Sequence, residues 1–212
     1  MKVEIWSDVV CPWCYVGKRR FESALARFPH QDEVEVVWKS FELDPNAPAS
    51  RGTTDEHLAR KYGITVEQAA RKHEEMTRVA ATEGLEFRMS ESKGGNTLDA
   101  HRLLHLASEH GLQRELKERL MRAYFTEGEP IGERETLARL AAEVGVPGAA
   151  EMLASDRFVN EVRDDEREAR EFGIDAVPVF VIDRRYGVEG AQSPEAILEV
   201  LEQAWTERAS VA

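Results

Sequence analysis

Two cysteines separated by two residues are the side chains of this sequence best suited to do chemistry. Cys11 and Cys14 are the only cysteines of the 212-residue chain, and Pro12 and Trp13 stand between them. A thiolate can attack a disulfide, and a second thiol nearby can then resolve the mixed disulfide that forms. In a compartment that keeps thiols reduced, a close cysteine pair is more often catalytic, redox-sensing or metal-binding than structural.

Zinc binding and plain burial are the alternatives for this pair. Zinc needs about four ligands, and a second pair of cysteines is absent. His101 and His105 lie one helical turn apart in an expected helix and could complete a site of cysteines and histidines. Free cysteine is also frequent in protein cores. The redox interpretation is favoured because the pair lies where a strand meets a helix, and we expect no metal.

The position of the pair at the start of a helix predicts different roles for the two thiols. Free N–H groups and the helix dipole favour negative charge there, so we expect this position to favour the Cys11 thiolate. Pro12 suits the first helical turn, where its missing N–H costs little. Cys14 lies one turn deeper, where it could attack a mixed disulfide between Cys11 and a substrate. We therefore expect an exposed, nucleophilic Cys11 and a shielded, resolving Cys14.

The surrounding pattern predicts which elements hold the dithiol. Apolar residues alternate in a short strand before Cys11, recur at helical spacing from Cys14 to Phe28, and alternate again over 34–41. A strand–helix–strand crossover of this kind implies parallel strands. Further along, glycines and prolines separate stretches that are typical of helices. The expected helices are 65–83, 97–110, 114–127, 134–144 and 156–172.

The last part of the chain returns to mixed structure. An apolar run over 179–182 follows Val177 and Pro178 and is expected to be a strand, with 184–188 as its hairpin partner. Ser193 is a predicted N-cap of a final helix. A peptide bond before proline can be cis, although the spacing alone also fits a plain proline at the entry of a strand.

Taken together, these motifs resemble the DsbA-like branch of the thioredoxin superfamily, and within it the FrnE-like group. The resembling segments are 7–17 (SDVVCPWCYVG), 96–102 (NTLDAHR), 177–180 (VPVF) and 187–192 (GVEGAQ). The resemblance implies an α/β protein with a thioredoxin-like fold and a large all-helical insertion. The implied thioredoxin-like domain is discontinuous, over 1–48 and 156–212, and the implied insertion covers 49–155.

The same resemblance implies a thiol–disulfide oxidoreductase or protein disulfide isomerase. Cys11 carries over as the nucleophile and Cys14 as the resolving thiol. The peptide bond before Pro178 would be cis and would face the dithiol, and the backbone of Val177 would pair with an extended substrate segment. No cofactor beyond the redox-active dithiol is implied, with glutathione a candidate reductant. The substrates would be protein or small-molecule thiols and disulfides.

Four further residues are expected at the substrate site. Pro12 and Trp13 would shape the rim of the cleft, with the Trp13 ring as an apolar contact for substrate. Asn96 and His101 belong to a segment that the resemblance places near the cleft, where they could contact substrate. The favoured alternative is structural: Asn96 would cap a helix, and His101 would be a satisfied, partly buried side chain.

Glutathione-dependent enzymes of related architecture are the alternative function. Kappa-class glutathione transferases and 2-hydroxychromene-2-carboxylate isomerases typically carry serine where this chain has Cys11. The kappa class also holds the γ-glutamyl group with a Ser-Asp pair, where this chain has Ala191 and Gln192. Both departures favour the oxidoreductase. A homodimer is a candidate by analogy with the relatives.

Charge and composition exclude other classes of partner. The formal net charge is −12, which argues against nucleic acid and anionic membranes, because both attract lysine and arginine. No segment approaches the roughly 18–20 consecutive apolar residues of a membrane span. No secretory signal is visible at the N-terminus, so we expect a cytoplasmic protein.

Overall fold

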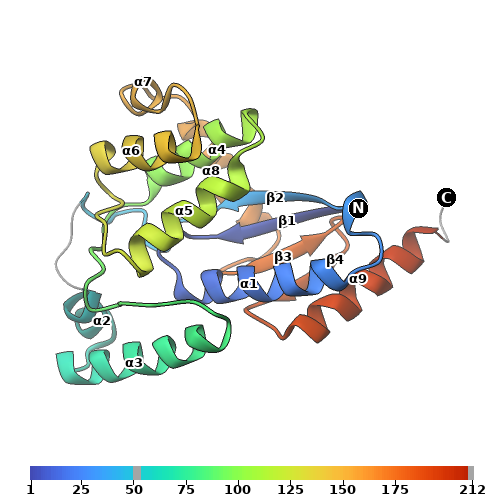
Figure 1. Ribbon diagram of the computed structural model, residues 1–212, viewed down its shortest axis with the longest axis horizontal. Helices are drawn as coiled ribbons and strands as arrows, with labels where there is room; N and C mark the ends of the chain where they lie inside the picture. The colour runs from blue at the N-terminus through green and yellow to red at the C-terminus, as the bar shows by residue number, and fades with distance from the viewer. Residues whose placement is uncertain (50–53, 210–212) are drawn as a thin grey trace.

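A mixed sheet of four strands forms the centre of this computed structural model, which describes residues 1–49 and 54–209 (Figure 1). The strand order is β2–β1–β3–β4, in which β2 runs parallel to β1 and the other neighbours are antiparallel. The predicted strands are confirmed, although the last begins later than expected. Their bounds are β1 (Lys2–Ser7), β2 (Glu35–Ser40), β3 (Val179–Ile182) and β4 (Tyr186–Glu189).

Helices account for most of the remaining described residues. Each predicted helix is present, the one expected from 156 begins later, and the short α2 and α7 were not expected. Ser193 caps the last helix as predicted, since its Oγ accepts a hydrogen bond from the Ala196 N–H at 3.2 Å. Within the described ranges, no helix is long and apolar enough to cross a membrane. The elements are α1 (Pro12–Arg27), the 3₁₀ turn η1 (Gln31–Glu33), α2 (Thr54–Tyr62), α3 (Val66–Thr82), α4 (Leu98–Glu109), α5 (Gln113–Phe125), α6 (Arg134–Val144), α7 (Ala149–Leu153), α8 (Val159–Glu171) and α9 (Pro194–Ala209).

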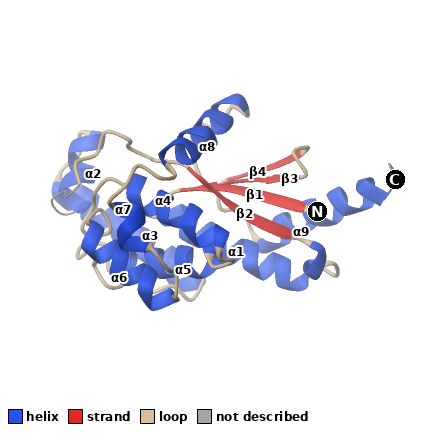
Figure 2. Cartoon of the chain, turned by 90° about the horizontal axis from the view of Figure 1, so that it is seen from above, coloured by secondary structure: helices blue, strands red, loops and turns tan. Residues whose placement is uncertain are grey.

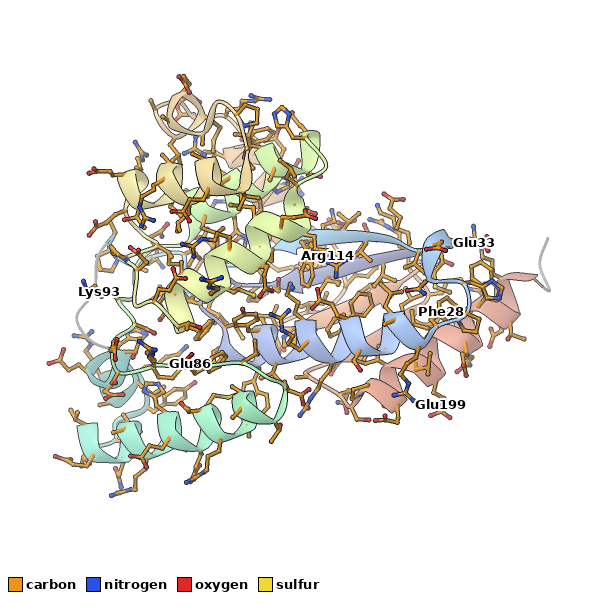
Figure 3. The ribbon with its side chains drawn as sticks, in the orientation of Figure 1. Phe28, Glu33, Glu86, Lys93, Arg114 and Glu199 are labelled. Carbon is orange, nitrogen blue, oxygen red and sulfur yellow. The ribbon has the colours of Figure 1, made fainter. Side chains whose placement is uncertain are left out.

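The two faces of the sheet are covered by different helices. Figure 2 shows α1 and α9 on one face and α8 on the other. On the first face, the rings of Phe21 and Phe180 stack with centroids 5.4 Å apart. Phe28, labelled in Figure 3, lies at the end of α1, and its ring contacts the Trp205 ring of α9. On the second face, the buried Trp6 donates its indole N–H to a backbone carbonyl of α8 at 2.9 Å. Burial of these aromatic rings fixes α1 against the sheet.

The helices α2 to α7 gather at the end of the sheet where β1 and β2 finish (Figures 1 and 2). This helical block is expected from the sequence, although residues 50–53 at its start lie outside the described residues. Its apolar core also contains Cys11, Cys14 and Tyr15 from the start of α1. The block therefore packs directly on the end of α1 that carries the dithiol. The exact limits 1–48, 49–155 and 156–212 stay a prediction.

Candidate active site

Cys11 is the N-cap residue of α1. Its backbone is extended, with φ −88° and ψ 114°, and its Sγ accepts a hydrogen bond from the Cys14 N–H at 3.3 Å. Pro12 occupies the first turn of the helix, as predicted. A helix N-terminus presents unpaired N–H groups and the positive end of the helix dipole, and the Cys11 sulfur lies at that end of α1.

Both thiols are free, and both are buried. The exposed fraction is 5% for Cys11 and 1% for Cys14. The shielded Cys14 is confirmed, whereas the prediction of an exposed Cys11 is wrong for this structure. The Cys11 thiol donates to the carbonyl oxygen of Val177 at 3.6 Å, and apolar residues of the helical block surround the cap. Only a small part of the Cys11 side chain is therefore accessible to a substrate.

The acidity of Cys14 fits a resolving thiol. Burial raises the pKa of Cys14 well above its ordinary value, and the hydrogen bond and charge of Cys11 raise it further. The positive charge of Lys117 and a backbone hydrogen bond at Asp8 act in the opposite direction. A thiol that stays protonated until it is needed does not compete with Cys11 for the first attack on a substrate.

The loop before β3 brings Val177 and Pro178 to the dithiol. The peptide bond between them is cis, as the resemblance implies. The carbonyl oxygen of Pro178 accepts a hydrogen bond from the Gly190 N–H at 2.8 Å, which links this loop to the end of β4. Pro178 also lies against α1 at Gly17, where an added Cβ would stand 2.9 Å from Pro178 Cγ. The fold thus assembles the dithiol and this loop from segments 166 residues apart.

Trp13 is the exposed side chain of the dithiol turn. Its exposed fraction is 46%, although both neighbouring cysteines are buried. An exposed indole beside a reactive thiol offers apolar surface and one N–H donor to a bound molecule. The structure therefore places Trp13 where a rim residue is expected, and its contact with substrate stays a prediction.

Asn96 holds the start of α4 to the loop after β2. Its Oδ1 accepts a hydrogen bond from the Leu98 N–H at 2.9 Å, and its Nδ2 donates to the Pro45 carbonyl at 3.1 Å. Thr97, and not Asn96, is the N-cap residue. These bonds use both ends of the side-chain amide, which supports the structural role for Asn96. A contact with substrate stays a prediction.

Polar side chains are buried next to the dithiol turn. We call Ser7, Asp8, His101 and Lys117 the buried polar cluster. His101 Nε2 lies 3.4 Å from Asp8 Oδ1, within ion-pair distance but outside hydrogen-bond geometry. Burial raises the pKa of Asp8, but His101, the Leu43 N–H and the charge of Lys117 together outweigh it, and the net pKa is below its ordinary value. His101 is 0% exposed, so in this structure it faces the loop before Cys11 and does not reach solvent.

Lys117 of α5 is a functional candidate that the sequence analysis missed. Its side chain is fully buried, and its Nζ donates to the Ser7 carbonyl at 3.3 Å and lies 5.6 Å from the centroid of the Trp38 ring. Burial lowers the pKa of Lys117 to about 8, although the negative charges of Cys14, Asp8 and Cys11 act to raise it. A lysine in an expected helix is ordinarily solvent-exposed, so nothing in the sequence pattern indicated this position.

The two histidines of the zinc alternative have other partners. His101 faces Asp8, and His105 Nε2 lies 3.2 Å from Asp165 Oδ2. In the described part of the chain, no three His, Cys, Asp or Glu side chains are grouped closely enough to hold a metal ion. What the arrangement offers instead is an N-cap thiol with a second, buried thiol behind it. This geometry is suited to disulfide exchange.

A family model described as a DSBA-like thioredoxin domain matches residues 2–202. The chain belongs to this family. Its structure is also similar to the crystal structure of a probable DsbA oxidoreductase from Streptomyces coelicolor. The two have a TM-score of 0.93 and 46% sequence identity, and the match covers 98% of this chain and 91% of that one. The expected DsbA-like, thioredoxin-type fold with a helical insertion is therefore confirmed.

More distant solved structures share the fold of this DSBA-like protein. The cytosolic disulfide reductase DsbM from Pseudomonas aeruginosa, solved with GSH, has a TM-score of 0.67 at 20% identity, over 97% of this chain and 100% of that one. A 2-hydroxychromene-2-carboxylate isomerase has a TM-score of 0.70 at 12% identity, over 100% of both chains. At these identities the likeness concerns the fold alone.

Proposed function

We propose that this DSBA-like protein is a thiol–disulfide oxidoreductase that works through Cys11 and Cys14. The observation that carries the proposal is the cap geometry of Cys11, whose Sγ accepts the Cys14 N–H at 3.3 Å and lies 3.6 Å from the Val177 carbonyl oxygen. A free thiol at a helix N-terminus, backed by a buried second thiol, is the arrangement that disulfide exchange requires. Membership of the DSBA-like family supports the same activity.

The reaction runs in two exchange steps. The Cys11 thiolate attacks one sulfur of a substrate disulfide; a mixed disulfide forms, and the second substrate sulfur leaves as a thiolate that takes a proton from water. Cys14 then loses its proton and attacks the Cys11 sulfur, which releases the first substrate sulfur as a thiol. The substrate disulfide gains two electrons, and the enzyme loses the same two electrons as the Cys11–Cys14 disulfide forms. A thiol such as glutathione would restore the dithiol by the reverse steps.

We propose that an extended segment of a protein disulfide, or a small disulfide, binds between the Val177 backbone and Trp13. Val177 is half-buried beside Cys11, and Trp13 is the exposed residue of the dithiol turn. Backbone pairing would give affinity without demanding a particular side-chain sequence, while the indole would add an apolar contact. This division suits an enzyme with many substrates.

Net reduction in the cytosol is the direction we favour. The structurally similar DsbM is described as a cytosolic disulfide reductase, and cytosolic thiols are kept reduced. The glutathione bound to that protein supports glutathione as the reductant for this one. Disulfide isomerase activity, membership of the FrnE-like group and a homodimer stay predictions.

A glutathione-dependent transferase or isomerase is the second candidate. The fold shared with a 2-hydroxychromene-2-carboxylate isomerase favours it. Against it stands Cys11, because the related enzymes typically carry serine at that position. Such a reaction would not need Cys14, and this difference separates the two candidates experimentally.

The test compares the unmodified protein with Cys11→Ser and Cys14→Ser in the reduction of insulin disulfides by glutathione. We expect turnover by the unmodified protein, none by Cys11→Ser, and a mixed disulfide on Cys11 that accumulates in Cys14→Ser and is visible by mass spectrometry. Equal turnover by Cys11→Ser and the unmodified protein would rule out the oxidoreductase. Conjugation or isomerisation of an aromatic substrate with glutathione, unaffected by Cys14→Ala, would favour the second candidate.

A further inference from the structure

The loop after β4 lies between α1 and the segment before β3. Residues 190–192 form this loop, and the Gly190 N–H donates a hydrogen bond to the Pro178 carbonyl at 2.8 Å. The next residue, Ala191, is half-buried and packs against the apolar core of the helical block. On the α1 side, a Cβ added to Gly17 would stand 3.5 Å from the Ala191 Cβ. The loop therefore contacts both the dithiol helix and the segment that faces the dithiol.

Arg20 of α1 holds this loop by a direct hydrogen bond. Its Nη1 donates to the carbonyl oxygen of Ala191 at 2.6 Å, and its Nε donates to Oε1 of Glu83 at 2.7 Å. The exposed fraction is only 21% for the Arg20 side chain and 19% for the Glu83 side chain. Water and salt therefore screen these contacts less than they screen an exposed ion pair. One guanidinium thus joins α1 to the loop after β4 and to Glu83.

Glu83 brings the helical block into the same contact. It is the C-cap residue of α3, and its own N–H donates to the Ala80 carbonyl at 3.0 Å. The end of α3 lies beside α1 (Figure 1). A guanidinium presents its N–H donors in a rigid planar fork, so a carboxylate that holds Nε also sets the direction of Nη1. Glu83 therefore orients the donor that Arg20 offers to Ala191.

The loop that Arg20 holds is bonded to the segment that faces the reactive sulfur. The Gly190 N–H donates to the Pro178 carbonyl, and the preceding carbonyl, that of Val177, accepts the Cys11 thiol at 3.6 Å. Cys11 caps the same helix that carries Arg20. The sulfur and the Arg20 guanidinium are therefore both held by α1, and the spacing between α1 and the segment before β3 depends on contacts such as that of Arg20.

We propose that Arg20 is a positioning residue for the substrate site: it holds the loop 190–192 against α1 and so fixes the Val177–Pro178 segment at the distance from Cys11 that an extended substrate needs. This inference rests on the proposed oxidoreductase function and deepens it. In this role Arg20 contacts no reacting atom. The helical block, through Glu83, would help to shape the substrate site in addition to covering the dithiol.

The first test observes the loop directly and uses no substrate. Arg20→Met keeps an apolar stem but removes every N–H donor of the side chain. A hydrogen bond to a charged group contributes about a factor of ten to an equilibrium constant, so we expect the Gly190 amide to exchange with deuterium about tenfold faster by NMR. The amides of β1 should keep their rates. Unchanged exchange of Gly190 would overturn the proposal. Equally faster exchange in β1 would do so too, because the effect would then concern the whole fold.

Arg27→Met is the matched control. Arg27 is a second arginine of α1 and pairs with Glu195 at 2.7 Å, but these side chains are 48% and 68% exposed. The variant removes the same chemical group from the same helix without touching the loop 190–192. We expect the Gly190 amide to exchange at its unmodified rate in Arg27→Met. Faster exchange there, as large as in Arg20→Met, would contradict a specific role for Arg20.

Two conservative variants separate positioning from plain loss of stability. An ammonium lacks the fork that bonds two groups at once, so Arg20→Lys should exchange Gly190 at a rate between those of the unmodified protein and Arg20→Met. Glu83→Gln keeps the guanidinium but weakens its orientation, and we expect about threefold faster exchange. If circular dichroism shows that Arg20→Met is not folded, Glu83→Gln decides the question, and an unchanged rate in that variant would reject the proposal.

The second test asks whether the held loop serves substrate binding. In the reduction of insulin by glutathione, we expect Arg20→Met to raise KM for insulin about tenfold and to change kcat by less than about twofold, because binding is lost and the exchange chemistry is kept. Arg20→Lys should recover part of the loss, and Arg27→Met should change neither constant. A lower kcat at an unchanged KM would mean that Arg20 acts on the thiol exchange, which would refute the positioning role.

The two tests fail for different reasons. If the unmodified protein does not reduce insulin, the proposed function is rejected, whereas the exchange rate of Gly190 still decides whether Arg20 holds the loop. If insulin is reduced and Gly190 exchanges faster in Arg20→Met while KM stays the same, the loop takes no part in substrate binding. The positioning proposal then fails although the oxidoreductase function stands.

Discussion

The thiol of Cys11 donates a hydrogen bond to the backbone carbonyl of Val177 at 3.6 Å, across 166 residues of intervening sequence. The helical block is inserted between these two residues in the chain, and its apolar core includes Cys11 and packs against Val177. The dithiol end of α1 is therefore held by three parts of the fold: the sheet beneath it, the loop before β3, and the helical block. Disturbing any of the three should alter exchange at Cys11.

Gly17→Ala tests the contact between α1 and the loop before β3. An alanine Cβ would lie 2.9 Å from Pro178 Cγ and 3.4 Å from the Phe180 ring. Overpacking costs about 1–3 kcal/mol, and the better helix propensity of alanine returns about 1 kcal/mol. We expect a net loss of about 1 kcal/mol in urea unfolding and slower reaction of Cys11 with a disulfide reagent. Gly187→Ala is the control, because no atom lies within 4 Å of its added Cβ; equal effects of the two variants would contradict the prediction.

Sequence signals formed by a few adjacent residues, such as helix caps and helix-ending glycines, predicted most of the fold. Pro12 begins α1, Gly145 ends α6 with φ 88°, and Ser193 caps α9, each as expected from a few adjacent residues. The helix α2 escaped prediction because its buried residues are Thr54 and Ala59, too few to form an apolar stripe. The helix α7 has five residues, which is too short for a periodic pattern.

The residues of the candidate site also divide into those that the sequence could predict and those that it could not. The dithiol could be found because both cysteines lie in one turn, and Val177 and Pro178 could be added by family resemblance. Lys117 could not, because its burial depends on a contact with Ser7, 110 residues away. The burial of Cys11 likewise depends on distant residues that cover the cap. Sequence patterns report the local periodicity of a helix, whereas these environments arise only from tertiary packing.

Glu118→Ala tests the attachment of the helical block to α1. Glu118 of α5 accepts hydrogen bonds from Tyr15 Oη at 2.7 Å and Lys18 Nζ at 2.6 Å, and it also pairs with Arg19. Removing the carboxylate leaves a buried ammonium and a phenol with fewer partners, so we expect a loss of about 1–2 kcal/mol in urea unfolding.

The control for this variant is Glu143→Ala. Glu143 pairs with Arg119 and Arg139, but its side chain is 40% exposed, and water can replace its contacts. We expect a much smaller loss than for Glu118→Ala. Similar losses in the two variants would show that the α1–α5 contact adds no more than a surface ion pair.

Asp165→Asn tests a buried carboxylate that joins α8 to β2 and α4. Asp165 accepts hydrogen bonds from Lys39 Nζ at 2.8 Å and the Ser40 N–H at 2.9 Å, and lies 3.2 Å from His105. Burial raises the pKa of Asp165, but the hydrogen bonds from His105, Lys39 and Ser40 outweigh it, and the net pKa is lowered. A carboxyl group with a lowered pKa stabilises the folded protein at pH values above the unfolded pKa of about 3.9. This stabilisation is lost as the pH falls through the pKa of the folded protein.

We therefore expect the free energy of unfolding of the unmodified protein to decrease as the pH is lowered below about 4. The decrease should be less steep in Asp165→Asn. The amide should also lower stability at neutral pH by about 1–3 kcal/mol, because it loses the charge-assisted bonds. Urea unfolding at a series of pH values measures both effects. If the free energy of unfolding decreased equally steeply with falling pH in the two proteins, Asp165 would not account for the acid sensitivity.

Trp13→Ala tests the rim of the proposed substrate site. Trp13 is 46% exposed, so its removal should change the free energy of unfolding by no more than about 0.5 kcal/mol. If the indole contacts an extended protein segment, kcat/KM for insulin should fall about tenfold, mainly through KM. Reaction of Cys11 with a small disulfide reagent should stay unchanged, because the thiol and its cap remain. Tyr62→Ala, which removes another exposed aromatic ring at the end of α2 (61% exposed), should leave both rates unaffected. If Trp13→Ala lowered the rate with the small reagent as much as it lowered kcat/KM for insulin, Trp13 would act on the thiol itself and not on the substrate.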